Sequence, residues 1–315
     1  MDFDDLIIKE FETLDTAKFT AVFSPPKIFL CGGPTRAMVP ESVRQRIMDH
    51  FVKKDKLVFD SIIQAEDFND YFKEGIYSDL LEFESDIANI ASLVVVCLES
   101  PGAFVELGMF CRDKSLAHKI LIIAPQEEVD KKNSFIYHGP LASLLRHDEK
   151  SVVVYPWADL KVLHYEHLDF MTKDITNKLA TVQASQKFDV NNSGHIALLI
   201  YDIIGLTCPI KKEEIQLSLL AMGISPSQRT LNKLLYLLEK IGLIKYTTYS
   251  MVDYYYDVGT FQRRIKFGMS IKGVVKDTPA LRMLFRQSYI LADNHEPSKK
   301  RRYALEAITK IRSQK

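Results

Sequence analysis

One glutamate stands alone in an otherwise apolar stretch of the chain. Glu106 lies in the run SPGAFVELGMF, and its neighbours from Ala103 to Phe110 are apolar or glycine. Burying an unpaired carboxylate is costly, so the group should be paired, have a raised pKa or face a ligand pocket. A carboxylate in such a pocket can attack or stabilise an electrophilic carbon. The spacing alone also permits a glutamate that simply points to solvent.

Alternating strands and helices should position this glutamate. The apolar run 93–98 is typical of a central parallel strand covered on both faces. It leads into a helix at 103–111, with Ser100 as N-cap and Pro101 at the first helical position. The other expected elements are strands at 27–33, 56–60, 119–124 and 151–155 and helices at 40–52, 80–91 and about 159–183. This order predicts an α/β fold with a Rossmann-like, doubly wound parallel sheet.

Ligands of open α/β sheets bind at the carboxyl ends of the strands. The loop CGGPTR follows the first strand, and Gly32 and Gly33 would let a phosphate or ribose approach the backbone closely. A plain tight turn explains the two glycines equally well. A second carboxylate has three candidates, each of which could equally be a solvated charge: Asp79, Asp86 and Glu99.

A different pattern begins after the polar, turn-rich segment 183–194. Helices are expected at 195–204, 211–222 and 225–241, the last with Ser225 as N-cap and Pro226 at its first position. Two β-like runs follow at 243–249 and 253–258. Three helices and a hairpin predict a winged helix-turn-helix domain. We therefore expect three parts: an α/β domain at 1–185, a winged-helix domain at 186–260 and a basic, helical tail at 261–315.

Charge is distributed unevenly along the chain. The net charge is zero, yet residues 261–315 contain 14 Lys and Arg against 4 Asp and Glu. Such asymmetry is typical of a polyanion-binding end attached to a different body. The third helix of a helix-turn-helix enters the major groove, although winged domains also bind proteins. The expected nucleic-acid contacts are Gln228, Arg229, Asn232 and Lys233 in that helix and Arg263, Arg264, Lys299, Lys300, Arg301 and Arg302 in the tail.

Composition excludes several classes of protein. No run of about 18 apolar residues is present and the N-terminal residues are acidic, so we expect a cytoplasmic protein that does not enter a membrane. The four cysteines are scattered in apolar runs, without the spacing of metal ligands, and are expected to be buried free thiols. We expect no metal and no cofactor.

The N-terminal domain resembles the nucleoside 2-deoxyribosyltransferase family and its N-glycosidase relatives. The resemblance is carried by FLCGGP in the first strand, SDIANIAS before the valine-rich strand and SPGAFVELG after it. In that family an AGP-like loop ends the first strand, a helix with an acidic residue leads into the valine-rich strand, and a GxxxE helix supplies the nucleophilic glutamate.

The resemblance assigns roles to particular residues. It implies that Glu106 is the nucleophile, and that the substrate is bound by Gly32, Gly33, Pro34, Ser100, Gly102 and Asp86. The transferases tend to have an Asp just before the glycine, where this chain has Ser100 and Pro101. This difference favours hydrolysis over exchange of bases. The chemistry would be that of a retaining glycosidase, in which a carboxylate reacts at C1′ and water completes the reaction.

An N-glycosidase domain followed by a winged-helix domain is similar to the deoxyribosyltransferase-like effectors of bacterial retron defence systems. The similarity implies a toxic enzyme that hydrolyses NAD or a related nucleotide. Its partners would be a retron reverse transcriptase and multicopy single-stranded DNA with attached RNA, which would hold it inactive. The similarity also implies that the protein could form a higher-order oligomer. Two alternatives remain open: a winged-helix DNA-binding regulator that senses a nucleotide without cleaving it, and a scaffold that associates head to tail.

Overall fold

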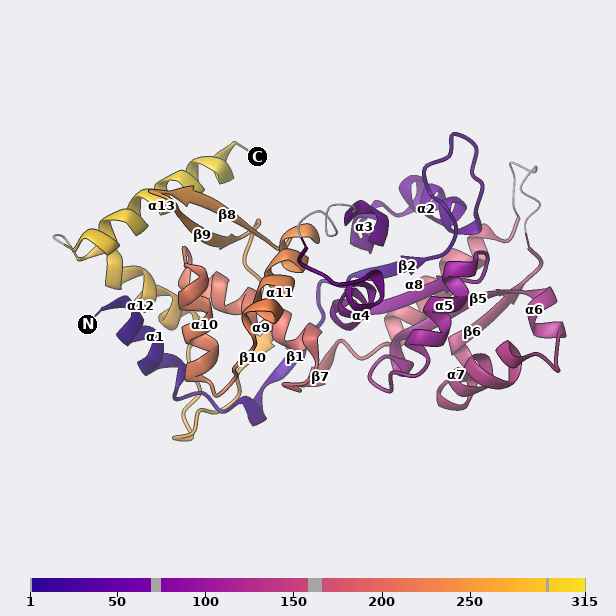
Figure 1. Cartoon of the computed structure of the whole chain (residues 1–315), viewed down its shortest axis with the longest axis horizontal. Helices are drawn as coiled ribbons and strands as arrows, with labels where there is room; N and C mark the ends of the chain where they lie inside the picture. The colour runs from indigo at the N-terminus through magenta and orange to yellow at the C-terminus, as the bar shows by residue number, and fades with distance from the viewer. Residues whose placement is uncertain (1, 69–74, 158–165, 293–294, 315) are drawn as a thin grey trace. The chain divides into compact units, whose positions relative to one another are not determined.

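Short apolar runs of the N-terminal half form a parallel sheet. The computed structural model describes residues 2–68, 75–157, 166–292 and 295–314. The strands are β2 (Ile28–Cys31), β3 (Ile62–Ile63), β4 (Leu93–Cys97), β5 (Ile120–Pro125) and β6 (Val152–Tyr155). They pair in parallel in the order β3-β2-β4-β5-β6 (Figure 1). The prediction of an α/β fold with a parallel sheet is confirmed.

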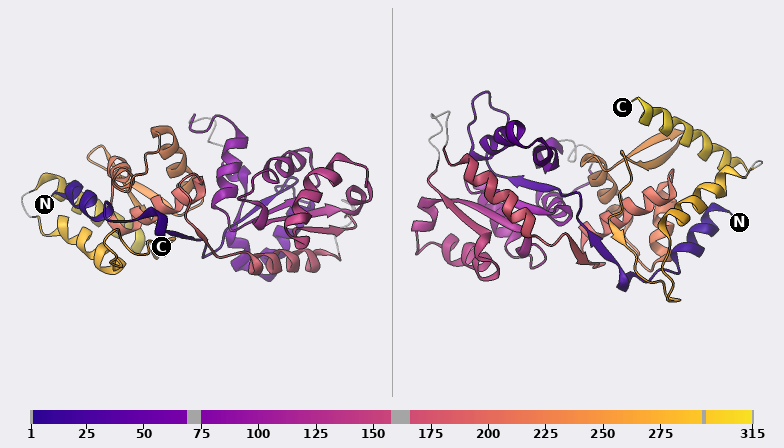
Figure 2. Two further views of the ribbon diagram at one scale, coloured as in Figure 1. Left: turned by 90° about the horizontal axis from the view of Figure 1, so that it is seen from below. Right: turned by 180° about the vertical axis from the view of Figure 1, so that it is seen from behind.

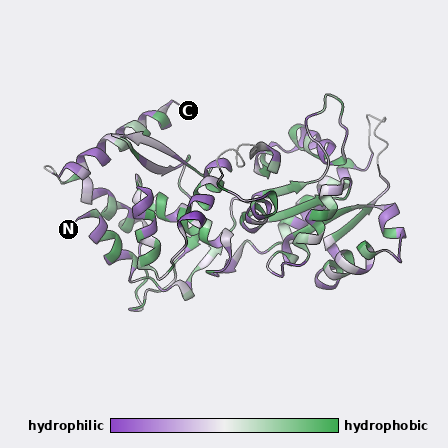
Figure 3. Ribbon diagram, viewed as in Figure 1, coloured by the Kyte–Doolittle hydropathy of each residue, from purple (hydrophilic) through white to green (hydrophobic). Residues whose placement is uncertain are grey.

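Helices cover both faces of this sheet, because alternate side chains of each strand point to opposite sides. On one face, Leu30 and Val95 pack with α2 (Val43–Lys54) and α8 (Leu168–Thr181) in a single buried cluster. On the other face, Phe29 meets Phe110 with ring centroids 6.1 Å apart. That face is covered by α4 (Leu80–Ile90) and α5 (Pro101–Phe110). The strands form the most apolar layer of this half (Figure 3).

Three expected elements differ from the structure. Residues 56–60 were predicted as a strand but lie in helix α3 (Lys56–Ser61), because Asp55 caps the helix by accepting from the Val58 amide. Helix α8 begins at Leu168, and residues 159–165 of the predicted helix lie outside the described residues. Helix α11 (Gln228–Lys240) begins later than predicted, since Ser227 rather than Ser225 provides the cap.

The chain divides into two compact units that do not follow its order. One unit comprises Phe23–Tyr71 and Asp79–Ala184, and the other Met1–Val22, Phe72–Ser78 and Ser185–Lys315. Residues 1–22 belong to the N-terminal domain in the division expected from the sequence. In the structure their strand β1 (Thr20–Val22) lies between two strands of the C-terminal half, which explains the different grouping.

The C-terminal unit contains a helical group, a hairpin and a small sheet. Its helices are α1 (Phe3–Phe11), α9 (Ser193–Thr207), α10 (Lys212–Ala221), α11, α12 (Thr278–Ile290) and α13 (Glu296–Ser313). Its strands are β1, β7 (Ser185–Lys187), β8 (Ile244–Tyr249), β9 (Val252–Asp257) and β10 (Ile265–Lys266). β8 and β9 form the hairpin, and β1 pairs antiparallel with β7 and β10 (Figure 2). Helix α1 and this sheet were not expected from the sequence, whereas α12 lies within the tail that was expected to be helical.

The remaining short helices lie in the α/β unit: α6 (Gln126–Asp130) and α7 (Ala142–His147). No helix among the described residues is both long and apolar enough to cross a bilayer. The four cysteines are free, but only Cys31 and Cys97 are buried, since Cys111 and Cys208 are partly exposed. The prediction of buried thiols is therefore wrong for the last two.

Candidate active site

The predicted active-site segment lies where the winding of the sheet changes direction. The chain adds β3 on one side of β2 and β4 on the other, and ligands of such sheets bind outside the carboxyl ends of these strands. The Ser100 hydroxyl accepts from the Ala103 amide at 3.2 Å and caps α5, with Pro101 at its first position. The predicted cap is confirmed, and it fixes the start of the helix that carries Glu106.

Glu106 lines a cavity of about 130 Å³. The other residues that line it are Phe29, Leu30, Cys31, Arg44, Ala65, Glu66, Leu80 and Glu84. The Oε2 atom of Glu106 is buried and has no hydrogen-bond partner within the described residues. Burial raises the pKa of Glu106 to about 7, while Arg44 and a hydrogen bond with the Cys31 thiol oppose the rise. Near neutral pH, this carboxylate is partly ionised and available to a ligand.

A second acidic group, Glu84, faces the same cavity and was missed by the sequence analysis. It is 6% exposed on α4, and burial, followed by the charge of Glu106, raises its pKa to about 8. At neutral pH Glu84 therefore keeps its proton while Glu106 begins to lose its own. The sequence held a signal for it: Glu84 occupies a position on the apolar stripe formed by Leu80, Phe83 and Ile87, where a carboxylate is unusual.

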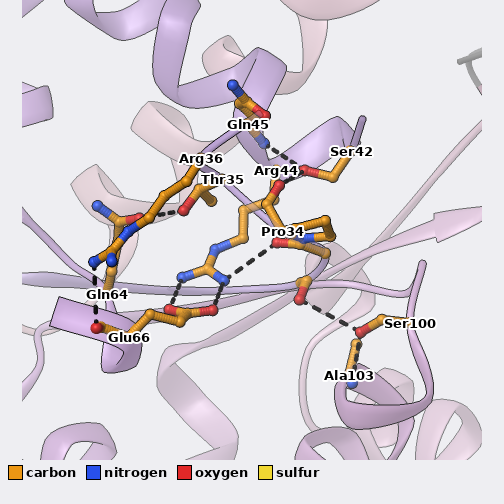
Figure 4. A network of polar contacts seen from close by, with 12 residues as sticks. Pro34, Thr35, Arg36, Ser42, Arg44, Gln45, Gln64, Glu66, Ser100 and Ala103 are labelled. Atoms are coloured by element: carbon orange, nitrogen blue, oxygen red, sulfur yellow. Dashed lines mark hydrogen bonds and ion pairs between the residues drawn. The ribbon is translucent and has the colours of Figure 1, made fainter. Parts of the chain in front are cut away.

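One buried cation lies beside the two glutamates. Arg44, whose side chain is 2% exposed, donates two hydrogen bonds to Glu66, with Nη1–Oε1 and Nη2–Oε2 distances of 2.5 and 2.8 Å (Figure 4). Its Nη1 also donates to the Gly33 carbonyl at 3.4 Å. Because Glu66 already neutralises Arg44, the cation holds the cavity wall in place and lowers the pKa of Glu106 only partly.

Glu99, a candidate for the second carboxylate, has a different position. Its carboxylate accepts from the amides of Gly33, Val43 and Arg44 at 2.9, 2.6 and 3.0 Å. It thus joins the loop after β2 to the first turn of α2. A Cβ at Gly32 would lie 2.9 Å from Glu99 Oε1, and one at Gly33 would lie 2.7 Å from the Ser42 Cβ. This close packing therefore requires the two glycines. From the sequence, they could be explained equally well by the approach of a ligand or by a plain tight turn.

The other predicted substrate-binding residues are not among those that line the Glu106 cavity. Asp79 caps α4 by accepting from the Glu82 amide, and Asp86 is buried on the same helix. The Pro34 carbonyl accepts from the Ser42 hydroxyl at 2.6 Å. At Gly102 a Cβ would meet only Ser100 Oγ, at 3.8 Å, so the start of α5 borders open space.

Comparison with known proteins identifies the group to which this arrangement belongs. The sequence matches the STM3845 retron effector protein family over residues 40–246, more than half of the chain. The chain belongs to this family of retron effectors.

Two relatives of the effector come from Escherichia coli. One, of retron Ec86, is 30% identical over 147 residues, which are 46% of this chain and 46% of the relative. The other, of retron Ec73, is 25% identical over 202 residues, 60% of this chain and 54% of the relative. Each is named as a "putative ribosyltransferase/DNA-binding protein". The matched region spans about half the length of each relative.

The residues predicted to bind nucleic acid fall into two groups in the retron effector. Gln228, Arg229, Asn232, Lys299 and Lys300 are exposed. The other five are engaged within the C-terminal unit: Lys233, Arg263, Arg264, Arg301 and Arg302. The basic tail is thus partly structural.

The engaged cations have specific partners. Arg301 pairs with Glu214 and its guanidinium lies 3.6 Å above the Phe3 ring. Arg263 donates from Nε to Asp202 at 3.3 Å, and the Asp202 carboxylate also accepts from the amides of Arg264 and Ile265. These contacts join α1, α10 and α13 and fix the start of β10, so the cations are already neutralised inside the unit.

Proposed function

We propose that this retron effector hydrolyses an N-glycosidic bond, with Glu106 as nucleophile and NAD or a related nucleotide as substrate. The observation that carries the proposal is the buried, unpartnered Oε2 of Glu106 beside a cavity at the switch point of the sheet. The names of the two relatives, which include ribosyltransferase, support chemistry at a ribose C1′.

The arrangement of the two glutamates suggests how such a reaction proceeds. Ionised Glu106 forms a bond to C1′ while the C1′–N bond breaks and its electron pair leaves with the base. A cationic base such as nicotinamide leaves as a neutral molecule, whereas other bases need a proton, which Glu84 holds. Glu84, ionised after it has given its proton to the base or, when nicotinamide is the base, has lost it to solvent, accepts a proton from the water that attacks C1′ and releases Glu106.

The C-terminal unit supports control by nucleic acid. Helices α9, α10 and α11 followed by the β8–β9 hairpin have the order of a winged helix-turn-helix. Ile210, in the connection between α9 and α10, forms a β-bridge with Tyr255 of the hairpin. We propose that a retron reverse transcriptase and its multicopy DNA and RNA bind the effector and hold it inactive. The DNA-binding part of the relatives' names supports this role.

The experiment is incubation of the purified protein with NAD, nucleotides and nucleosides, with products separated by chromatography. We expect release of the base from at least one substrate. Glu106→Gln should lose this activity by a factor of about 10³ or more because the amide is a poor nucleophile, while its thermal unfolding is retained. Glu127→Gln, an exposed glutamate of α6, is the matched control and should keep full activity.

An equally active Glu106→Gln variant would overturn the proposal. A second function, a nucleotide-sensing regulator, is favoured by the same helices and hairpin. It requires that the protein leave every substrate intact and bind a defined duplex.

A further inference from the structure

The first turns of α12 border a wide cleft in the C-terminal unit. Its volume is about 560 Å³. It is lined by Phe261, Arg263, Thr278, Pro279, Arg282, Met283 and Arg286. Arg282 and Arg286 lie one turn apart on α12 and are exposed, so both side chains can reach the same ligand. Neither arginine is among the residues predicted from the sequence to bind nucleic acid.

The charges of these two arginines are not neutralised within the described part of the chain. The structure shows no acidic partner for Arg282 or Arg286 there, whereas Arg263 in the same cleft donates to Asp202 and to the Ile265 carbonyl. Most cations of the basic tail that line the interior of the unit are neutralised in this way. Two neighbouring guanidinium groups without acidic partners are suited to bind phosphate groups, which they recognise with paired hydrogen bonds.

An aromatic ring completes the cleft. Phe261 is partly exposed, and the Arg282 guanidinium lies 5.2 Å from its ring centroid. Nucleic-acid bases stack on aromatic rings and on guanidinium planes. A base can reach a ring in the wall of a cleft only when it is unpaired and turned outward, which excludes a base held within a duplex. An acidic protein segment would use the arginines but has no aromatic base to stack here.

We propose that this cleft binds single-stranded nucleic acid, with phosphates on Arg282 and Arg286 and a base against Phe261. This site would provide a contact for the nucleic acid that we propose controls the effector. The binding itself does not depend on that control, but its biological role does. The main contact then lies on α12 and not on the predicted recognition residues Gln228 to Lys233 or on Lys299 and Lys300.

The test measures binding of a fluorescent, single-stranded oligodeoxynucleotide of mixed sequence to the full-length protein by anisotropy. We expect the double variant Arg282→Gln/Arg286→Gln to raise Kd by about tenfold or more and to reduce the slope of log K against log salt by about 1.4, as expected when two phosphate contacts to a single strand are lost. The matched control, Lys299→Gln/Lys300→Gln, removes the same charge from exposed positions of α13 and should change Kd less than threefold.

Two further measurements keep the result specific. Phe261→Leu should weaken binding without changing the salt slope, because the ring makes no phosphate contact; its thermal unfolding is compared, since Phe261 also contacts Tyr201. Glu106→Gln should bind the oligonucleotide like the wild type, so a failure of the proposed catalysis is distinguished from a failure here. The inference is overturned if the control variant loses as much affinity as the arginine variant, if a duplex of the same sequence binds more tightly, or if only polyglutamate binds.

Discussion

Glu99 and Glu106 lie seven residues apart at the same edge of the sheet, yet their surroundings differ completely. The carboxylate of Glu99 accepts from three backbone amides and joins the loop after β2 to α2. The Oε2 atom of Glu106 is equally buried but lacks a partner within the described residues. A satisfied carboxylate stabilises the fold, whereas an unsatisfied one costs stability and is kept available for a ligand.

The comparison distinguishes a buried carboxylate that stabilises the fold from a buried carboxylate that is available to a ligand. Burial raises the pKa of both groups, but the backbone amides oppose the rise at Glu99, and the cavity of Glu106 offers only Cys31 and the charge of Arg44. Glu84 belongs with Glu106 by this criterion, because burial and nearby carboxylates raise its pKa to about 8. Substitutions at Glu84 and Glu106 should therefore affect catalysis, and substitution at Glu99 should affect stability.

After the loss of activity in Glu106→Gln, the largest effect is expected for Glu84→Gln on catalysis. Wild-type activity should fall below about pH 7, where Glu106 takes up a proton, and above about pH 8, where Glu84 loses the proton it donates. The variant should lose roughly a hundredfold in kcat for a substrate whose base needs a proton, and its decline above pH 8 should disappear. The measurement is kcat against pH for base release.

Asp86→Asn on the same helix is the control for this experiment and tests a predicted substrate-binding residue. If Asp86→Asn, and not Glu84→Gln, removed the alkaline decline, the proton would belong to Asp86 and the assignment of Glu84 would be wrong.

A smaller effect, on stability, is expected for Glu99→Gln. The amide keeps one accepting oxygen but turns a donor either toward the Val43 amide, at the Oε2 position, or toward the amides of Gly33 and Arg44, at the Oε1 position. It also removes the negative charge at the start of α2. Loss of charge-assisted hydrogen bonds should lower the free energy of unfolding by about 2 kcal/mol, measured by urea denaturation. Glu106→Gln under the same conditions should lose much less, because its Oε2 has no hydrogen-bond partner among the described residues; an equal loss in both variants would contradict the distinction.

The smallest effect is the pH dependence of stability at Glu84. Its pKa is raised in the folded protein from 4.5 to about 8, so the folded state holds a proton that the unfolded state releases. This contribution is fully present below pH 4.5 and is lost as pH rises through about 8. Between pH 6 and pH 7, the unfolding free energy of the wild type should fall by about 1 kcal/mol more than that of Glu84→Gln, which lacks this titration. Equal changes in the two proteins over this range would contradict the raised pKa of Glu84.

The parallel sheet and the cap of α5 could be predicted from sequence because both depend on local patterns: uninterrupted apolar runs and a Ser-Pro pair before a helix. The α3 segment could not, since KLVFD has strand-like residues, and its helix is stabilised by the cap at Asp55 and by the ion pair between Lys56 and Asp60. Glu106 was identifiable as an isolated carboxylate. Glu84 and Arg44 required the fold, because they meet Glu106 only when α2, α4 and α5 gather at one edge of the sheet.

In the basic tail, the sequence predicted too many ligand-binding residues rather than too few. A count of Lys and Arg treats every cation as available, but Arg301 is buried against Glu214 and Phe3, while Arg282 and Arg286 remain exposed without acidic partners among the described residues. An excess of basic residues in the sequence therefore predicts that the tail binds an anion. Which of these residues are available to bind it is shown only by the positions of their acidic partners in the fold.

The strand β1 has a consequence for synthesis of the chain. Thr20 pairs with Lys187 on one side and with Lys266 on the other, so its two neighbours are made long after it. A growing chain leaves one edge of this strand unpaired until the ribosome has passed β7 and the other until it has passed β10, and loop closure over such distances is slow. The C-terminal unit is thus the last to close during translation, and a prematurely terminated chain that ends before β10 lacks the means to complete it.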